Sequence, residues 1–172
     1  MKVEVYIENT YIKAPDSNYP IDRSLLESLD EIPWQNWFQT WLEALASQIQ
    51  FADSYELSLR LNSDREIQAL NYQYRQQNKP TDVLAFAALE TELIQPENTG
   101  EPLYLGDIVI SLDTAANQAS DRGHDLVTEV AWLASHGLLH LLGWDHPDET
   151  NLQKMLLKQA SLLELVKITD HF

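Results

Sequence analysis

Alternating apolar and polar positions mark two short segments as strands with one buried face. Residues 3–8 alternate in this way, and so do residues 56–61. Successive side chains of a strand point to opposite faces of a sheet, so a two-residue period predicts a half-buried strand. Two apolar runs of strand length, 82–89 and 104–112, flank the acidic segment 90–101. We expect these two runs to form an antiparallel hairpin with a long tip.

A period of three to four residues indicates helices. Trp34, Trp37 and Trp41 recur at this spacing, which favours an amphipathic helix packed on the sheet over a platform for a ligand. Ser63 and Glu66 have the spacing of a capping box, so a helix is expected to begin there. The helices expected from periodicity and capping lie at 34–45, 63–77, 114–122, 126–142 and from 147 onward.

These elements predict the α+β class, with a small mixed β-sheet of about four strands and about five α-helices. The chain has 172 residues, of which 44% are hydrophobic, and it shows no internal repeat or linker. We therefore expect a single domain over residues 1–172. No run of about 18 apolar residues is present, and the first residues alternate like a strand. The expectation is a cytoplasmic protein with no membrane partner.

Charge and cysteine content narrow the possible chemistry. The chain carries 27 acidic and 11 basic side chains, a net charge of −16, which counts against a general nucleic-acid binder, and no DNA partner is expected. Charge acts locally in a cleft, however, and Arg65, Arg75 and Lys79 lie close together before a predicted strand, so RNA remains possible. Because the chain has no cysteine, a transition-metal site must be built from His, Asp and Glu.

Three of the five histidines fall within eleven residues, at the end of the expected central helix 126–142. His136 and His140 are one helical turn apart and share a face. Gly143 can end the helix in a left-handed conformation, which allows His146 to return toward the same point. Three nitrogen ligands leave one tetrahedral position of zinc open, as in catalytic sites. We predict one zinc ion per chain, although nickel, iron and copper also suit imidazole.

The spacing H-x-x-x-H-x-x-G-x-x-H is also that of the metzincin proteases, so a metalloprotease is the first alternative. Those enzymes carry a glutamate directly after the first histidine as general base. Here that position is Gly137. Peptide hydrolysis would therefore lack an evident base.

The stretch 136–146 resembles the H-G-x-L-H-L-x-G-[YW]-D-H motif of the YbeY endoribonuclease family of bacterial rRNA maturation factors. The resemblance continues upstream, in order, at Asn71, Tyr74-Arg75, Pro80 to Leu84, Phe86, Gly106-Asp107-Ile108 and Ser111. Departures from the family pattern are Ala85 for Ser, Ala87 for Pro and Trp144 for the commoner Tyr.

This resemblance implies a zinc-dependent, single-strand-specific endoribonuclease that processes the 3′ end of small-subunit rRNA and acts in ribosome quality control. It implies that His136, His140 and His146 bind the zinc and that Arg75 lies in the active cleft. The candidate catalytic residues are Arg75, which can pair with phosphate oxygens, and His136. Glu129 is expected either to orient a histidine ligand or to form a surface ion pair.

A third function class is a non-catalytic, zinc-containing ribosome assembly factor. A net charge of −16 would suit docking on basic ribosomal proteins better than binding of free RNA.

Overall fold

The computed structural model describes residues 1–11, 21–88 and 100–168. Its strands are β1 (Lys2–Asn9), β2 (Ser54–Asn62), β3 (Val83–Ala87) and β4 (Leu103–Ser111). Its helices are α1 (Arg23–Asp30), α2 (Trp34–Ala44), the short 3-10 helix η1 (Ala46–Gln48), α3 (Asp64–Arg75), α4 (Leu112–Arg122), α5 (Leu126–Leu141) and α6 (Glu149–Leu165). The predicted hairpin tip, 90–101, lies almost entirely outside the described residues.

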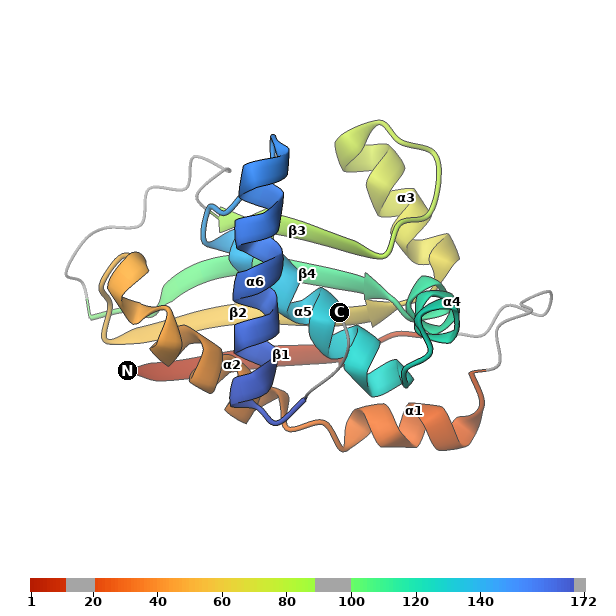
Figure 1. Ribbon diagram of the computed structural model, residues 1–172, viewed down its shortest axis with the longest axis horizontal. Coiled ribbons are helices and arrows are strands. Elements are labelled where there is room, and N and C mark those ends of the chain that lie inside the picture. Colours follow the sequence, from red (N-terminus) through yellow and green to blue (C-terminus); the bar gives the residue numbers. More distant parts are fainter. Residues whose placement is uncertain (12–20, 89–99, 169–172) are drawn as a thin grey trace.

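The four strands form one mixed sheet in the order β1-β2-β4-β3 (Figure 1). Strands β1, β2 and β4 run parallel to one another. Strand β3 pairs antiparallel with β4 at the edge, in a register that sets Ala85 opposite Ile108. The predicted α+β class, the small mixed sheet and the antiparallel pairing of its last two strands are confirmed.

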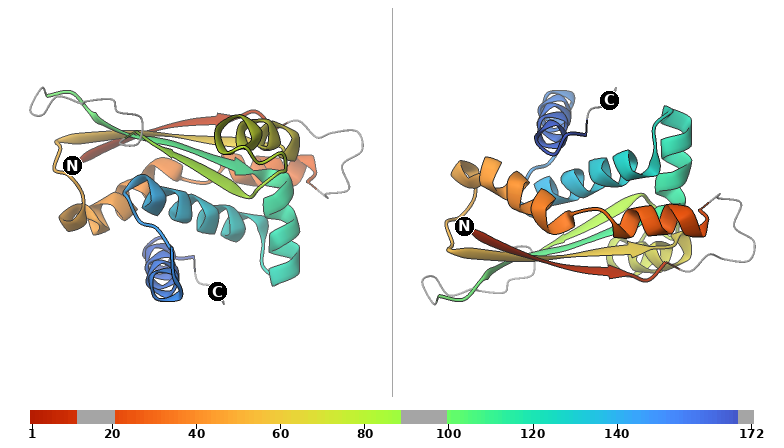
Figure 2. Two further views of the ribbon diagram at one scale, coloured as in Figure 1. Left: turned by 90° about the horizontal axis from the view of Figure 1, so that it is seen from above. Right: turned by 90° about the horizontal axis from the view of Figure 1, so that it is seen from below.

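Helices cover the two faces of this sheet unequally (Figure 2). On one face α2 lies against β1 and α5 lies against β3 and β4, while α6 packs on α2 and α5 on the side away from the sheet. On the other face α3 lies over β4, where Ile67 packs with Leu84 and Val109 in a small second core. Among the described residues, much of that second face carries no helix (Figure 2).

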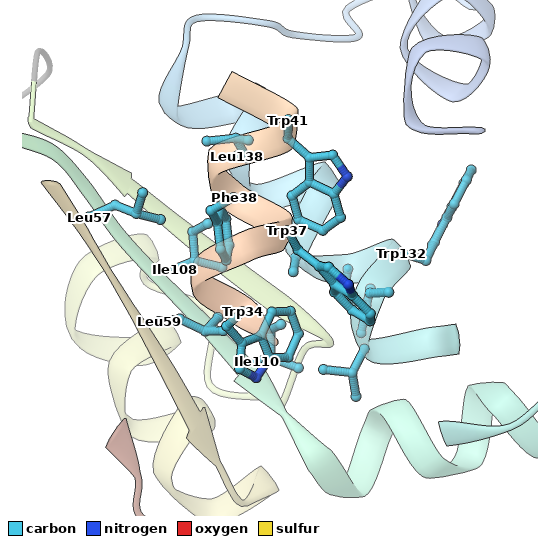
Figure 3. Close-up of a cluster of buried hydrophobic side chains, with 14 of the residues drawn as sticks. Trp34, Trp37, Phe38, Trp41, Leu57, Leu59, Ile108, Ile110, Trp132 and Leu138 are labelled. Carbon is cyan, nitrogen blue, oxygen red and sulfur yellow. The ribbon is translucent and has the colours of Figure 1, made fainter. Parts of the chain in front are cut away.

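The tryptophan-rich helix α2 is a core helix, as its periodicity predicts. Its aromatic side chains Trp34, Trp37, Phe38 and Trp41 are buried and lie against apolar residues of the sheet and of α5 (Figure 3). The Trp41 indole also donates a hydrogen bond to the Leu162 carbonyl of α6 over 2.8 Å. Helix α2 thus joins the sheet to α6 and fixes the helical layer that carries the histidines.

The described residues include one short α-helix that the sequence analysis did not name. The additional helix, α1, has eight residues, and Asp22 caps its first turn by accepting from the Leu25 amide. Leu29 is the buried residue of this helix. A single buried position gives too weak a period to be recognised in the sequence. Leu112, expected at a strand end, instead begins α4, because the Ser111 side chain caps that helix.

Across the described ranges, none of the helices is both long and apolar enough to cross a membrane.

Candidate metal centre

Three imidazole rings converge where α5 ends. His136 and His140 lie one turn apart on this helix, and Gly143 then adopts a left-handed conformation with φ of 94°. The Gly143 amide bonds to the His140 carbonyl over 3.0 Å, which closes the turn and returns His146 to the two rings. One ligand atom from each histidine lies within 4.8 Å of the others, so the cluster could hold a metal ion. The predicted helix, glycine turn and convergence are therefore all present.

The spacing of the rings fits a single transition-metal ion. Nε2 of His136 and Nε2 of His140 are 3.0 Å apart. The His146 ring centroid lies 5.8 Å from that of His136 and 5.4 Å from that of His140. Nitrogens bound at about 2.0–2.1 Å to one tetrahedral zinc would lie about 3.3 Å from one another. The His136 and His140 nitrogens are already at nearly this separation, and His146, which is exposed, lies nearby.

A hydrogen bond to α6 selects the ring form of His136 that a metal needs. Nδ1 of His136 lies 3.0 Å from the side-chain oxygen of Gln159, a fully buried residue. An amide oxygen only accepts, so the ring proton sits on Nδ1 and the Nε2 lone pair faces the cluster. The Gln159 amide nitrogen points to the Trp132 carbonyl, which holds the side chain in this orientation. Sequence analysis did not identify Gln159.

The electrostatics of the cluster also favour neutral imidazoles. Burial lowers the pKa of His136, and the Gln159 hydrogen bond and nearby Asp82 oppose that shift. Burial likewise lowers the pKa of His140, and the neighbouring rings of His136 and His146 lower it further. A metal binds the unprotonated nitrogen, so both shifts increase the fraction of rings ready to bind near neutral pH.

Gly137 lies where α5 packs closely on the sheet. A Cβ atom at this position would lie 2.7 Å from Cγ2 of Ile108, which is fully buried on β4. A side chain at residue 137 would therefore require α5 or Ile108 to move. The glutamate that metzincin proteases carry here is absent from the sequence, and the packing leaves no room for one.

A cavity of about 460 Å³ opens beside the histidines, and Arg75 lines it together with His136 and His140. Arg75 is the last residue of α3, which the predicted capping box of Ser63 and Glu66 begins. Its guanidinium donates to the Ala85 carbonyl on β3 over 3.0 Å. Helix α3 and the edge strand together hold an exposed cation at the rim of the cavity, 61 residues before His136 in the chain.

Two acidic side chains line the same cavity, Asp82 and Asp145. Asp82 accepts from the Val83 amide over 2.7 Å and from the Gln118 side chain over 3.2 Å. Sequence analysis did not identify the place of Asp82 beside the histidines. Among the residues lining this cavity in the described part of the chain, Arg75 is the one lysine or arginine.

Neither expectation for Glu129 is correct. Its carboxylate is fully buried, accepts from Arg122 over 2.7 Å and contacts Nε2 of His124. It therefore bonds to no histidine of the cluster, and the ion pair it forms is not on the surface. Position 129 lies two helical turns before His136, and its side chain turns back toward the α4–α5 connection rather than forward to the cluster.

Comparison with known proteins gives consistent matches. The family described as "Endoribonuclease YbeY" matches residues 22–167. A Nostoc protein named endoribonuclease YbeY is 64% identical over 169 residues, which cover 98% of this chain and 92% of that protein. A Trichormus variabilis protein of the same name is 52% identical over 169 residues, covering 98% of this chain and 96% of its own length. A solution structure of a Thermotoga maritima protein is 25% identical, with a TM-score of 0.53 over 95% of this chain and 89% of that one.

Proposed function

The chain belongs to the YbeY endoribonuclease family, and on that premise we propose that it is a zinc-dependent endoribonuclease that cleaves single-stranded RNA. We further propose that its substrate is the 3′ end of small-subunit rRNA, that it acts with ribosomes or ribosomal proteins in maturation and quality control, and that it works in the cytoplasm. The whole chain, residues 1–172, would act as one catalytic domain.

The observation that carries this proposal is the placement of Arg75 in one cavity with His136 and His140. A metal site alone is compatible with many hydrolases. A guanidinium held beside it adds recognition of an oxyanion, and a planar guanidinium pairs well with two phosphate oxygens. The combination therefore favours a phosphodiester over a peptide as the bond that is cleaved.

Each part of the site has a role in this proposal. Zinc, held by His136, His140 and His146, supplies Lewis acidity toward water and toward a phosphate oxygen when bound. Arg75 binds the phosphate and neutralises the negative charge that grows on it as the bond breaks. Gln159 keeps the Nε2 lone pair of His136 directed at the metal position.

A metalloprotease is the weaker alternative, because the position of its general base is Gly137 and is packed against Ile108. A non-catalytic assembly factor is supported by the net charge of −16, which suits docking on basic ribosomal proteins. It does not account for a cationic side chain held at the rim of the histidine cavity.

The deciding experiment compares nuclease-free wild-type protein with His136→Ala on labelled single-stranded RNA, on a duplex of the same sequence, and on an unfolded protein. The expected result is cleavage of the single strand by the wild type alone, together with loss of bound zinc in the variant as measured by mass spectrometry. Equal RNA cleavage by both proteins would indicate a contaminating nuclease. Protein cleavage without RNA cleavage would support the protease, and zinc binding without any cleavage would support the assembly factor.

A further inference from the structure

A second cavity, of about 380 Å³, lies on the opposite face of the sheet from the histidines, beside α3. Its walls include Tyr74 and Leu70 from α3, Phe86 from β3, Asp107 and Val109 from β4, and Arg60 from β2. Phe86 belongs to the small second core under α3, whereas Ala85 packs against the main core under α5. The neighbouring residues Ala85 and Phe86 of β3 thus line two different cavities at one edge of the sheet.

Arg75 joins these two cavities. It lines the histidine cavity, yet its guanidinium lies 5.4 Å from the centre of the Phe86 ring, which lines the second cavity. Its hydrogen bond to the Ala85 carbonyl places it at the edge of β3, between the two faces. A phosphate bound by Arg75 would therefore lie at the point where a strand of RNA can pass from one cavity to the other.

The second cavity offers an aromatic surface. The rings of Tyr74 and Phe86 are 5.3 Å apart at an angle of 64°, and 53% of Tyr74 is exposed. Aromatic side chains of this kind bind single-stranded nucleic acids by stacking on the bases, whatever the sequence. Phe86 already carries the Arg75 guanidinium near its ring, which leaves Tyr74 as the ring more open to a base.

The charges of the second cavity favour a neutral occupant. Arg60 pairs with Glu8 at 3.5 Å, and Asp107 accepts hydrogen bonds from Ser58 and Tyr104. An incoming phosphate would meet the Asp107 carboxylate and a cation that is already paired. A planar, uncharged base would be neither repelled by the Asp107 carboxylate nor in need of an unpaired cation. It could stack on the Tyr74 ring and form hydrogen bonds with the polar side chains of the cavity.

We infer that the Tyr74–Phe86 cavity is a subsite for a nucleobase of the RNA substrate, within a few nucleotides of the phosphate that Arg75 binds. This inference rests on the proposed function and deepens it. The strand crosses the edge of β3 at Arg75, so that the scissile phosphate lies at the histidines and the base lies on the other face of the sheet. A duplex cannot make this crossing, because its bases are paired and stacked, and the subsite therefore selects single strands.

The test uses full-length Tyr74→Ala, Tyr74→Phe and Tyr72→Ala proteins. Tyr72 lies on the same helix, is 62% exposed and lines neither cavity, so its variant is a matched control. Binding of a labelled, mixed-sequence single-stranded RNA to the metal-free proteins is measured by fluorescence anisotropy, and cleavage is measured with zinc present.

Tyr74→Ala is expected to weaken binding by about fivefold to a hundredfold, the usual effect of removing one stacked base. KM should rise by a similar factor while kcat changes little, and Tyr74→Phe and Tyr72→Ala should match the wild type. Binding of a duplex of the same sequence should be the same for all four proteins.

An unchanged Tyr74→Ala protein, or an equal loss in Tyr72→Ala, would overturn the subsite and leave the endoribonuclease proposal intact. A wild-type protein that neither binds nor cleaves single-stranded RNA would overturn both. A loss confined to kcat would also reject the subsite, since it would place Tyr74 in the chemical step.

Discussion

The side-chain oxygen of Gln159 accepts a hydrogen bond from Nδ1 of His136 over 3.0 Å, although the two residues lie on different helices. Helix α6, which is described over its whole length, contributes no residue to the lining of the Arg75 cavity, but through this bond it fixes the orientation of one ring of the cluster. The geometry of the candidate metal site therefore depends on the packing of α6 on α5 as well as on the three histidines.

Gln159→Leu should weaken zinc binding by about tenfold to a hundredfold, the usual cost of losing a hydrogen-bond partner of a metal ligand. Leucine fills a similar volume but offers no acceptor for Nδ1. Gln159→Glu keeps the acceptor and should retain wild-type affinity or bind more tightly. Zinc affinity is measured by competition with a chelating dye, and Gln153→Ala, on the exposed side of α6, serves as the control. Equal affinities for wild type and Gln159→Leu would remove Gln159 from the site.

Arg75→Ala should retain zinc and the melting temperature but lose cleavage of single-stranded RNA by about tenfold to a thousandfold, the range for one electrostatic contact in a transition state. Arg75→Lys should recover only part of this loss, because an ammonium group cannot pair with two phosphate oxygens at once. Arg65→Ala is the control, since Arg65 is exposed near the start of the same helix. Unchanged turnover in Arg75→Ala would exclude Arg75 from the mechanism.

Sequence patterns were sufficient where the signal is local. The histidine cluster lies within eleven residues, and helical periodicity with one glycine turn determines how its members meet. The capping box of Ser63 and Glu66 is equally local and predicts where α3, the helix that carries Arg75, begins. The α+β class followed from the alternation of the strands and the longer period of the helices.

Contacts between segments that are distant in the chain leave no local pattern in the sequence, so they were not predicted. Gln159 reaches His136 across 23 residues, and Asp82 joins the cavity only once β3 pairs with β4 beneath α5. Glu129 lies at a helical position from which it could bind a histidine of the cluster. Its carboxylate instead binds Arg122 and His124. Spacing along a helix shows which residues share a face, but the neighbouring elements determine what each side chain contacts.

The metal-free protein should lose stability as the pH falls below about 6.5, the pKa of histidine in an unfolded chain. Burial lowers the pKa of His136 and of His140 in the folded state. Between the lowered and the unfolded pKa the unfolded chain binds more protons, so acid favours unfolding. Urea unfolding of the chelator-treated protein at several pH values measures this slope. The slope should be smaller in His136→Ala, and an equal slope would show that the acid sensitivity arises elsewhere.

Gly137→Ala should destabilise the fold by about 1–3 kcal/mol, the usual cost of forcing an added methyl group into a packed core. Its Cβ would lie 2.7 Å from Cγ2 of Ile108, so either Ile108 or α5 would have to move, and a movement of α5 would carry His136 and His140 with it. Ile108→Ala removes the clashing Cγ2 atom and makes room, so Gly137→Ala should cost less stability in that background than in the wild type. The melting temperatures of the two single variants and the double variant measure this coupling. If the two effects simply add, the contact with Ile108 is not what requires glycine at position 137.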